Sequence, residues 1–132
     1  MPTILRKSSP SMPAIRREIL HAVSWQVRAS SWSPPTDLFE TESSFNVRVE
    51  IAGMHDQDFE VSVENNILFI AGSRPDQSER RAYHQMEIRF GKFDIAIGIP
   101  SEVNVDEATA EYKNGFLTVV LPKARSERSG GM

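Results

Sequence analysis

Apolar and polar residues alternate along most of the chain after residue 44, and this spacing predicts β-strands with one buried face. Four segments show the alternation, and the intervening polar residues point to the opposite side. The inward positions are Phe45, Val47, Val49 and Ile51, then Phe59, Val61 and Val63, then Phe93, Ile95, Ile97 and Ile99, and finally Leu117, Val119 and Leu121. Residues 67–71 form a more continuously apolar strand that ends before Gly72.

Turn residues separate these segments. Asn65-Asn66 provides a tight turn, and Asn114-Gly115 is the dipeptide that a two-residue type I′ turn requires, because both of its central residues need a positive φ. Seven or more short strands joined in this way predict an all-β, two-sheet β-sandwich. Residues 73–81 are polar and form a long loop, after which residues 83–90 could return as a strand.

The first part of the chain has a different period. Ile15, Ile19, Val23 and Val27 recur every four residues, which predicts an amphipathic helix over about residues 14–27. Residues that break helices flank it on both sides. We therefore expect an N-terminal arm over 1–31, one sandwich domain over 32–123 and a short flexible tail over 124–132.

Composition limits the class of protein. A chain of 132 residues, 39% hydrophobic and 25% charged, is typical of a single soluble domain with arms. The absence of Cys excludes disulfides and thiolate catalysis, and it fits a reducing cytoplasm, where we expect the protein. No apolar run is long enough for a membrane span, and we find no secretory signal before residue 32.

Charge is distributed unevenly. Residues 1–31 carry five basic residues against one acidic residue, residues 32–122 carry seven against sixteen, and residues 123–132 carry three against one. Basic arms thus flank an acidic body. The arms are either solvated or packed against acidic surfaces of neighbouring subunits. We expect no nucleic-acid partner, because the acidic body would repel phosphates.

The sequence offers no catalytic constellation. His21, His55 and His84 are widely separated, and none has a second ligand at metal-binding spacing. No Gly-x-Ser-x-Gly elbow, phosphate-binding loop or dinucleotide fingerprint is present. We expect a protein that is not an enzyme and that needs no cofactor or metal.

Several motifs in collinear order resemble the small heat-shock protein family, which carries the Hsp20 or α-crystallin domain. They cover roughly residues 32–123, beginning with Trp32-Ser33-Pro34-Pro35. The closing hairpin matches the family pattern Ala-x-x-x-Asn-Gly-Phe-Leu. The matching segments are Trp32 to Thr41, Val49 to Met54, Gly91-Lys92-Phe93 with Ile99-Pro100, and Ala110 to Leu117.

This resemblance implies an immunoglobulin-like β-sandwich and an ATP-independent holdase, a chaperone that binds unfolding client proteins through exposed apolar surface and prevents their aggregation. The long loop is similar to that of bacterial and plant members, in which a strand of the loop is exchanged to form a homodimer. The exchanged strand implied here includes Tyr83, His84, Met86, Glu87 and Arg89. Larger homo-oligomers are a further expectation.

The family also has a groove that accepts an Ile-x-Ile or Ile-x-Val segment from a neighbour's tail. The residues implied for it are Val61, Val63, Ala108 and Ala110. The tail from Lys123 contains no Ile, Val or Leu, so it cannot supply that anchor. Either assembly stops at small oligomers, or the arm fills the groove. Ile95 is a second departure, because the family usually has Arg there.

Client binding and assembly are assigned to apolar residues of the arm and its junction with the domain. These are Ile15, Ile19, Val23, Trp25, Val27 and Trp32. The alternative is that the helix packs on its own sandwich. Two other functions are alternatives to a holdase. One is an adaptor or co-chaperone module that serves one partner, and the other is a carbohydrate-binding sandwich in which the two Trp residues stack on sugars.

Overall fold

The computed structural model describes residues 32–76 and 79–124, and the expected arm helix and most of the tail lie outside these ranges. The described chain contains seven strands and two short 3₁₀ turns. The strands are β1 (Thr36–Glu40), β2 (Ser44–Glu50), β3 (Phe59–Glu64), β4 (Ile67–Arg74), β5 (Gly91–Gly98), β6 (Thr109–Lys113) and β7 (Phe116–Pro122). The turns are η1 (Asp56–Asp58) and η2 (Val105–Glu107).

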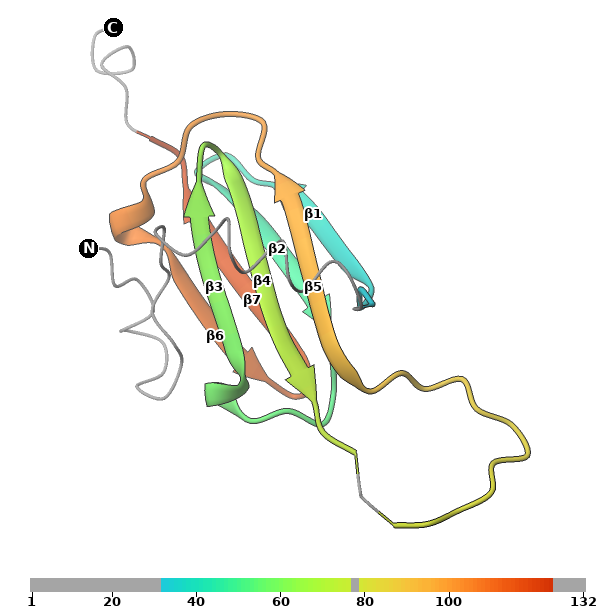
Figure 1. The fold of residues 1–132 in the computed structure, drawn as a ribbon. Coiled ribbons are helices and arrows are strands. Elements are labelled where there is room, and N and C mark those ends of the chain that lie inside the picture. Colours follow the sequence, from blue (N-terminus) through green and yellow to red (C-terminus); the bar gives the residue numbers. More distant parts are fainter. Residues whose placement is uncertain (1–31, 77–78, 125–132) are drawn as a thin grey trace, which may run out of the picture.

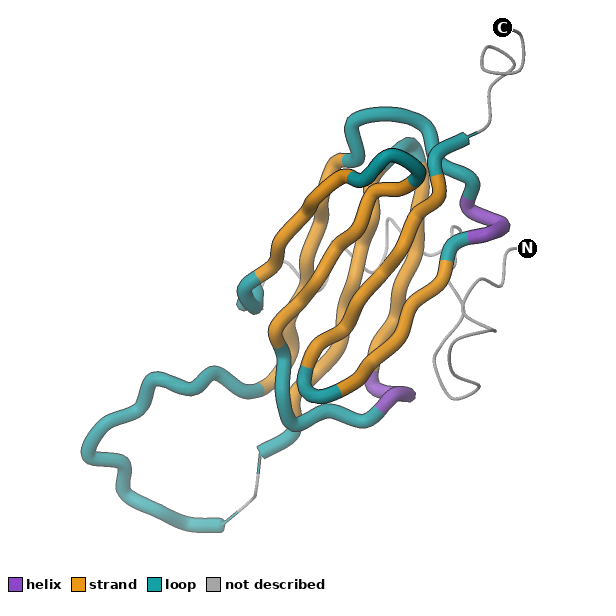
Figure 2. The backbone as a smooth tube through the Cα atoms, turned by 180° about the vertical axis from the view of Figure 1, so that it is seen from behind, coloured by secondary structure: helices purple, strands orange, loops and turns teal. Residues whose placement is uncertain are grey.

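The strands form two antiparallel sheets that pack face to face (Figure 1). One sheet has the order β1-β2-β7-β6 and the other has the order β3-β4-β5. Viewed from behind, the strands of both layers run along the length of the sandwich, and the connections between them lie at its two ends (Figure 2). The prediction of an all-β, two-sheet sandwich is therefore confirmed.

The core lies between the sheets and is built from the alternating apolar positions. Strand pairing sets Val61 beside Ile70, and Ile70 beside Ile95, so one row of side chains crosses the whole three-stranded sheet on its inner face. From the other sheet, Val47 and Val119 pair in the same way and are fully buried. Burial of apolar surface on both inner faces supplies most of the stability of such a sandwich.

The two predicted hairpin turns have the expected backbone. Asn65 and Asn66 have φ values of 55° and 62°, and Asn114 and Gly115 have values of 54° and 84°. All four central residues thus occupy the left-handed region that a type I′ turn demands. Both turns were predicted from sequence, and both are confirmed.

Residues 75–90 form the long connection between β4 and β5 and project from one end of the sandwich (Figure 1). The suggested strand over 83–90 is absent from the described part of this single chain. The alternation in that segment has no neighbouring strand with which to pair, so its backbone groups find no ladder within the subunit.

Candidate interaction surfaces

Strand β1 is a free edge of the four-stranded sheet. It pairs with β2 on one side only, from Thr36 opposite Val49 to Glu40 opposite Phe45. Leu38 and Phe39 are exposed on it. An edge of this kind offers unpaired N–H and C=O groups to another chain.

The projecting loop carries the residues expected in the exchanged strand. Tyr83, Met86 and Ile88 are 47%, 59% and 64% exposed. Met86 and Ile88 are two residues apart and lie between Gln85, Glu87 and Arg89, the spacing of a strand with one apolar face. The loop therefore has the pattern of a strand and, in this chain, no sheet to join.

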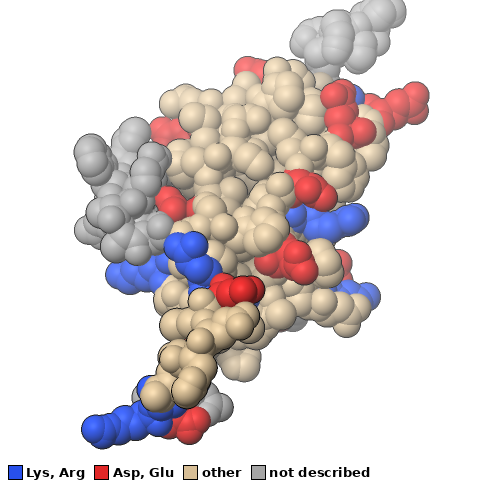
Figure 3. Space-filling model, turned by 90° about the vertical axis from the view of Figure 1, so that its right-hand side faces the viewer, with Lys and Arg blue, Asp and Glu red and all other residues tan. Residues whose placement is uncertain are grey.

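The polar residues of the loop are engaged mainly with one another. The side-chain amide of Gln85 donates to a carboxylate oxygen of Glu87 at 3.1 Å, and Arg81 donates to the Tyr83 hydroxyl at 2.9 Å. Arg81 also lies 3.8 Å from an Asp76 carboxylate oxygen. Figure 3 shows basic and acidic side chains together at the tip of this projection, and both kinds again over its root and the body above it.

Arg74, the last residue of β4, anchors the returning end of the loop. Its guanidinium donates from Nε and a terminal nitrogen to the Arg89 carbonyl, and from the other terminal nitrogen to the Ala52 carbonyl at 3.3 Å. The same group lies 5.0 Å from the ring centre of Trp32 and 5.1 Å from that of Phe90. Only a planar cation with several donors can make all these contacts together.

Trp32 belongs to the same junction. Its ring packs edge to face on Phe93 at 5.8 Å, and its indole N–H donates to the Gly91 carbonyl at 3.3 Å. Its backbone pairs with β5, since the N–H of Asp94 donates to the Trp32 carbonyl at 3.0 Å. Of the six residues expected to bind clients, Trp32 is thus partly buried against the core, and the other five lie outside the described residues.

The junction borders a hollow of about 640 Å³ between the root of the loop and the corner after β2. The residues that line it include Trp32, Ala52, Gly53, Arg74, Ile88 and Phe90. The Tyr112 hydroxyl fixes that corner by donating to the Ile51 carbonyl at 2.7 Å and accepting from the Met54 N–H at 3.3 Å. The exchanged-strand residues Glu87 and Arg89 also border this hollow.

The four residues expected in the groove are brought together at one side of the sandwich. Val61 and Val63 lie on the edge strand β3, whereas Ala108 and Ala110 lie just before and within the edge strand β6 (Figure 1). All four are core residues with exposed fractions between 0% and 3%. A polar hollow of about 410 Å³ lies at the end of β3 and is lined by Val63, Glu64 and Glu102 among others.

Sequence reasoning missed Arg74, because nothing in its local pattern distinguishes it from the other arginines. Ile95, noted as a departure from the family, is a core residue that is 6% exposed and pairs with Ile70. The only local signal for Arg74 is its place at the end of an apolar strand, immediately before Pro75.

In residues 32–76 and 79–124, no group of three or more His, Cys, Asp or Glu side chains could hold a metal ion. The described ranges likewise contain no helix long and apolar enough to cross a membrane. His55 precedes η1, where its backbone N–H donates to Asp58 at 2.9 Å, and His84 is exposed in the loop.

Comparison with known proteins gives a consistent answer. The model of the Hsp20/alpha crystallin family matches residues 37–130. Small heat shock protein C2 of Rickettsia felis is 35% identical over 92 residues, covering 68% of this chain and 60% of that protein. Heat shock protein 16 of Schizosaccharomyces pombe is 33% identical over 101 residues, covering 74% and 71%. The chain therefore spans about 60% of the length of the first of these relatives.

Solved structures agree with the sequence matches. Heat shock protein 16.0 from Schizosaccharomyces pombe superposes with a TM-score of 0.64 at 30% identity, covering 74% of this chain and 71% of that one. The hspA structure from Xanthomonas axonopodis gives a TM-score of 0.66 at 28% identity, covering 71% and 96%. The resemblance noted in the motifs is thus confirmed, and the chain belongs to the Hsp20/α-crystallin family.

Proposed function

We propose that this protein is a chaperone that acts as an ATP-independent holdase, binding unfolding clients through apolar surface and keeping them from aggregating. Membership of a family of small heat-shock proteins supports the chaperone role. The alternative remains an adaptor module that serves a single partner.

The observation that carries the proposal is that the chain has both a free sheet edge, at β1, and a strand-like loop segment with no strand beside it. Strand β1 exposes Leu38 and Phe39, and the projecting loop exposes Met86 and Ile88. In a dimer, the loop segment of each copy could lie along the β1 edge of the other copy and add a strand to its sheet, so that the backbone N–H and C=O groups of both become hydrogen-bonded. We therefore propose a homodimer formed by strand exchange over residues 83–89.

Assembly beyond the dimer would depend on the arm. The tail from Lys123 lacks an aliphatic anchor, and the proposed groove residues are closed into the core. The arm carries the apolar stripe of Ile15, Ile19, Val23 and Val27, so we assign to it both client binding and contacts between dimers.

The test measures mass by light scattering after size exclusion, together with suppression of client aggregation in the absence of nucleotide. The variant Met86→Asp with Ile88→Asp places charges on the apolar face of the exchanged strand, and Phe116→Asp makes a matched change at an exposed aromatic elsewhere. We expect the intact protein and the Phe116 variant to be dimers or larger, and the loop variant to be monomeric. An intact monomer that does not suppress aggregation would contradict the proposal and favour the adaptor.

A further inference from the structure

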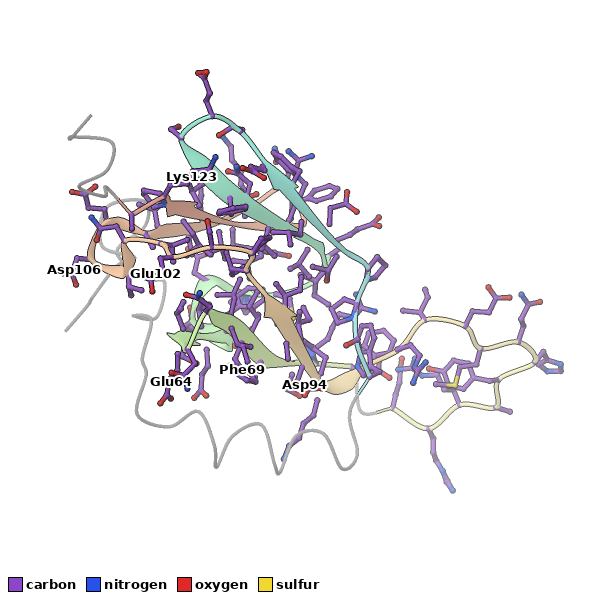
Figure 4. The ribbon with its side chains drawn as sticks, turned by 90° about the horizontal axis from the view of Figure 1, so that it is seen from above. Glu64, Phe69, Asp94, Glu102, Asp106 and Lys123 are labelled. Atoms are coloured by element: carbon purple, nitrogen blue, oxygen red, sulfur yellow. The ribbon has the colours of Figure 1, made fainter. Side chains whose placement is uncertain are left out.

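The outward face of the three-stranded sheet carries an apolar patch on its central strand. Along β4, Ile67, Phe69 and Ala71 point away from the core, and Ala96 of β5 is paired with Phe69. We call these four residues the outer β4 patch. Figure 4 shows Phe69 on the side of the sheet turned away from the other layer. Ile67 is 36% exposed, Phe69 is half-buried and Ala96 is exposed, whereas Ala71 is only 8% exposed.

Strand β4 is thus apolar on both faces, since Leu68 and Ile70 point into the core. A sheet with one solvated face normally alternates apolar and polar residues, whereas a strand that is apolar on both faces is typical of a sheet covered on both sides. The outward face of the other sheet is different, because charged neighbours such as Arg48 and Glu111 flank its central positions. The neighbours of Phe69 are the uncharged Ser62 and Ala96.

Carboxylates border the patch. Pairing places Glu64 beside Ile67, and it places Glu60 and Asp94 on either side of Ala71. Glu64 and Asp94 lie on the same side of the sheet as Phe69 (Figure 4). An apolar strip with an acidic border is complementary to an amphipathic segment with a basic border.

The arm of this chain has that composition. Residues 1–31 carry a net charge of +4, from five basic residues and one acidic residue, and Arg16 and Arg17 lie beside the stripe that begins at Ile15. A helix over residues 14–27 would be about 21 Å long. The patch runs from Ile67 to Ala71 and measures about 14 Å along β4, so a helix of this length is long enough to cover it.

The chain enters the sandwich at the correct edge for this contact. The backbone of Trp32 pairs with β5, the strand next to β4, through the N–H of Trp32 and the Lys92 carbonyl at 3.3 Å. Residues 28–31 separate the helix from this point, and four residues span up to about 14 Å. Neighbouring strands are about 4.8 Å apart, so the linker reaches the centre of the sheet.

We infer that the outer β4 patch is the docking surface for residues 14–27 of the same chain, bound as an amphipathic helix with its apolar stripe on Phe69. Docking covers the patch and the stripe together, so the stripe is available to clients or to other dimers only while the arm is undocked. This inference concerns a contact within one chain, and its test does not depend on chaperone activity.

Disulfide trapping tests the contact, because the chain has no Cys of its own. Ala22 directly precedes Val23 of the stripe and lies three residues after Ile19, so it is on the same side of the predicted helix. The variant Ala22→Cys with Ala96→Cys places one thiol beside the stripe and one in the patch, and Ala22→Cys with Thr118→Cys places the second thiol on the opposite sheet. Both are oxidised at low protein concentration and followed on non-reducing gels. We expect an intrachain disulfide, seen as a faster monomer band, in the first variant and not in the second.

A second comparison separates docking from chance collision. Ile67→Thr and Phe69→Thr are added to the Ala22→Cys, Ala96→Cys variant, because Thr still favours a strand. The rate of disulfide formation should fall about tenfold, since roughly 55 Å² or more of apolar contact is lost. Phe116→Thr, a matched change on the other sheet, should leave the rate unchanged. Equal rates for the Ala96 and Thr118 pairs, no effect of the patch substitutions, or a disulfide that joins two chains would each overturn the inference. Client aggregation enters none of these readouts.

Discussion

At the scale of single residues, Arg74 determines how the loop leaves the sandwich. One guanidinium holds the Arg89 carbonyl, the Ala52 carbonyl and two aromatic rings. These contacts join the end of β4 to the corner after β2, to Trp32 and to the part of the loop that leads back into β5. The direction in which the exchanged segment projects therefore depends on one side chain.

We expect Arg74→Lys to lower the free energy of unfolding by about 1–2 kcal/mol, because the ammonium cannot make the forked hydrogen bonds. Amides at residues 87–90 should exchange faster with deuterium, and the proposed dimer should dissociate more readily. Arg48→Lys is the control, since Arg48 lies 5.4 Å from the Phe39 ring and has no comparable fork of carbonyls. Equal exchange at residues 87–90 in both variants would argue against this role.

At the scale of elements, the two hairpin turns have the same backbone but different second residues. The second central residue is Asn66 in the β3–β4 turn, with a φ of 62°, and Gly115 in the β6–β7 turn, with a φ of 84°. A side chain in the left-handed region costs free energy that Gly avoids, although Asn tolerates it better than most residues.

The turns therefore predict a reciprocal result. Asn66→Gly should raise the free energy of unfolding by about 0.5–1 kcal/mol, and Gly115→Asn should lower it by about the same amount. Urea unfolding of both variants checks the pair. A shift in the same direction for both would mean that the side chain, and not the backbone, governs these turns. The Asn66 carbonyl accepts from the Ile99 N–H at 2.8 Å, and Gly keeps that acceptor.

At the scale of the whole molecule, the arm and the sandwich are expected to have separate roles. Removing residues 1–31 should leave the strand-exchanged dimer intact, because β1 and the loop are unchanged. Larger assemblies and most suppression of client aggregation should be lost with the apolar stripe. Light scattering and aggregation assays on the shortened chain test this. A shortened chain as large and as active as the intact protein would place both roles in the sandwich.

The sequence by itself determined the alternating strands β2, β3, β5 and β7 with their inward faces, the apolar strand β4 and the two Asn-containing turns, whereas the strand that it suggested over 83–90 is absent from the described part of the chain. These features depend on near neighbours: alternation fixes which face of a strand is buried, and a positive φ selects Asn or Gly. The motifs around Trp32, Gly91 and Asn114 also indicated the family, because they are read in linear order.

Only the tertiary structure decided which residues meet across the sheets. It brought Arg74 to Trp32, Ala52 and Arg89, closed Val61 and Ala110 into the core, and left Phe69 facing outward among uncharged neighbours. Local sequence patterns do not predict these contacts, because each contact joins residues that are far apart in sequence and depends on how the two sheets pack. The surfaces on which partners would bind are therefore decided by packing, whereas the strands that build them are decided by sequence.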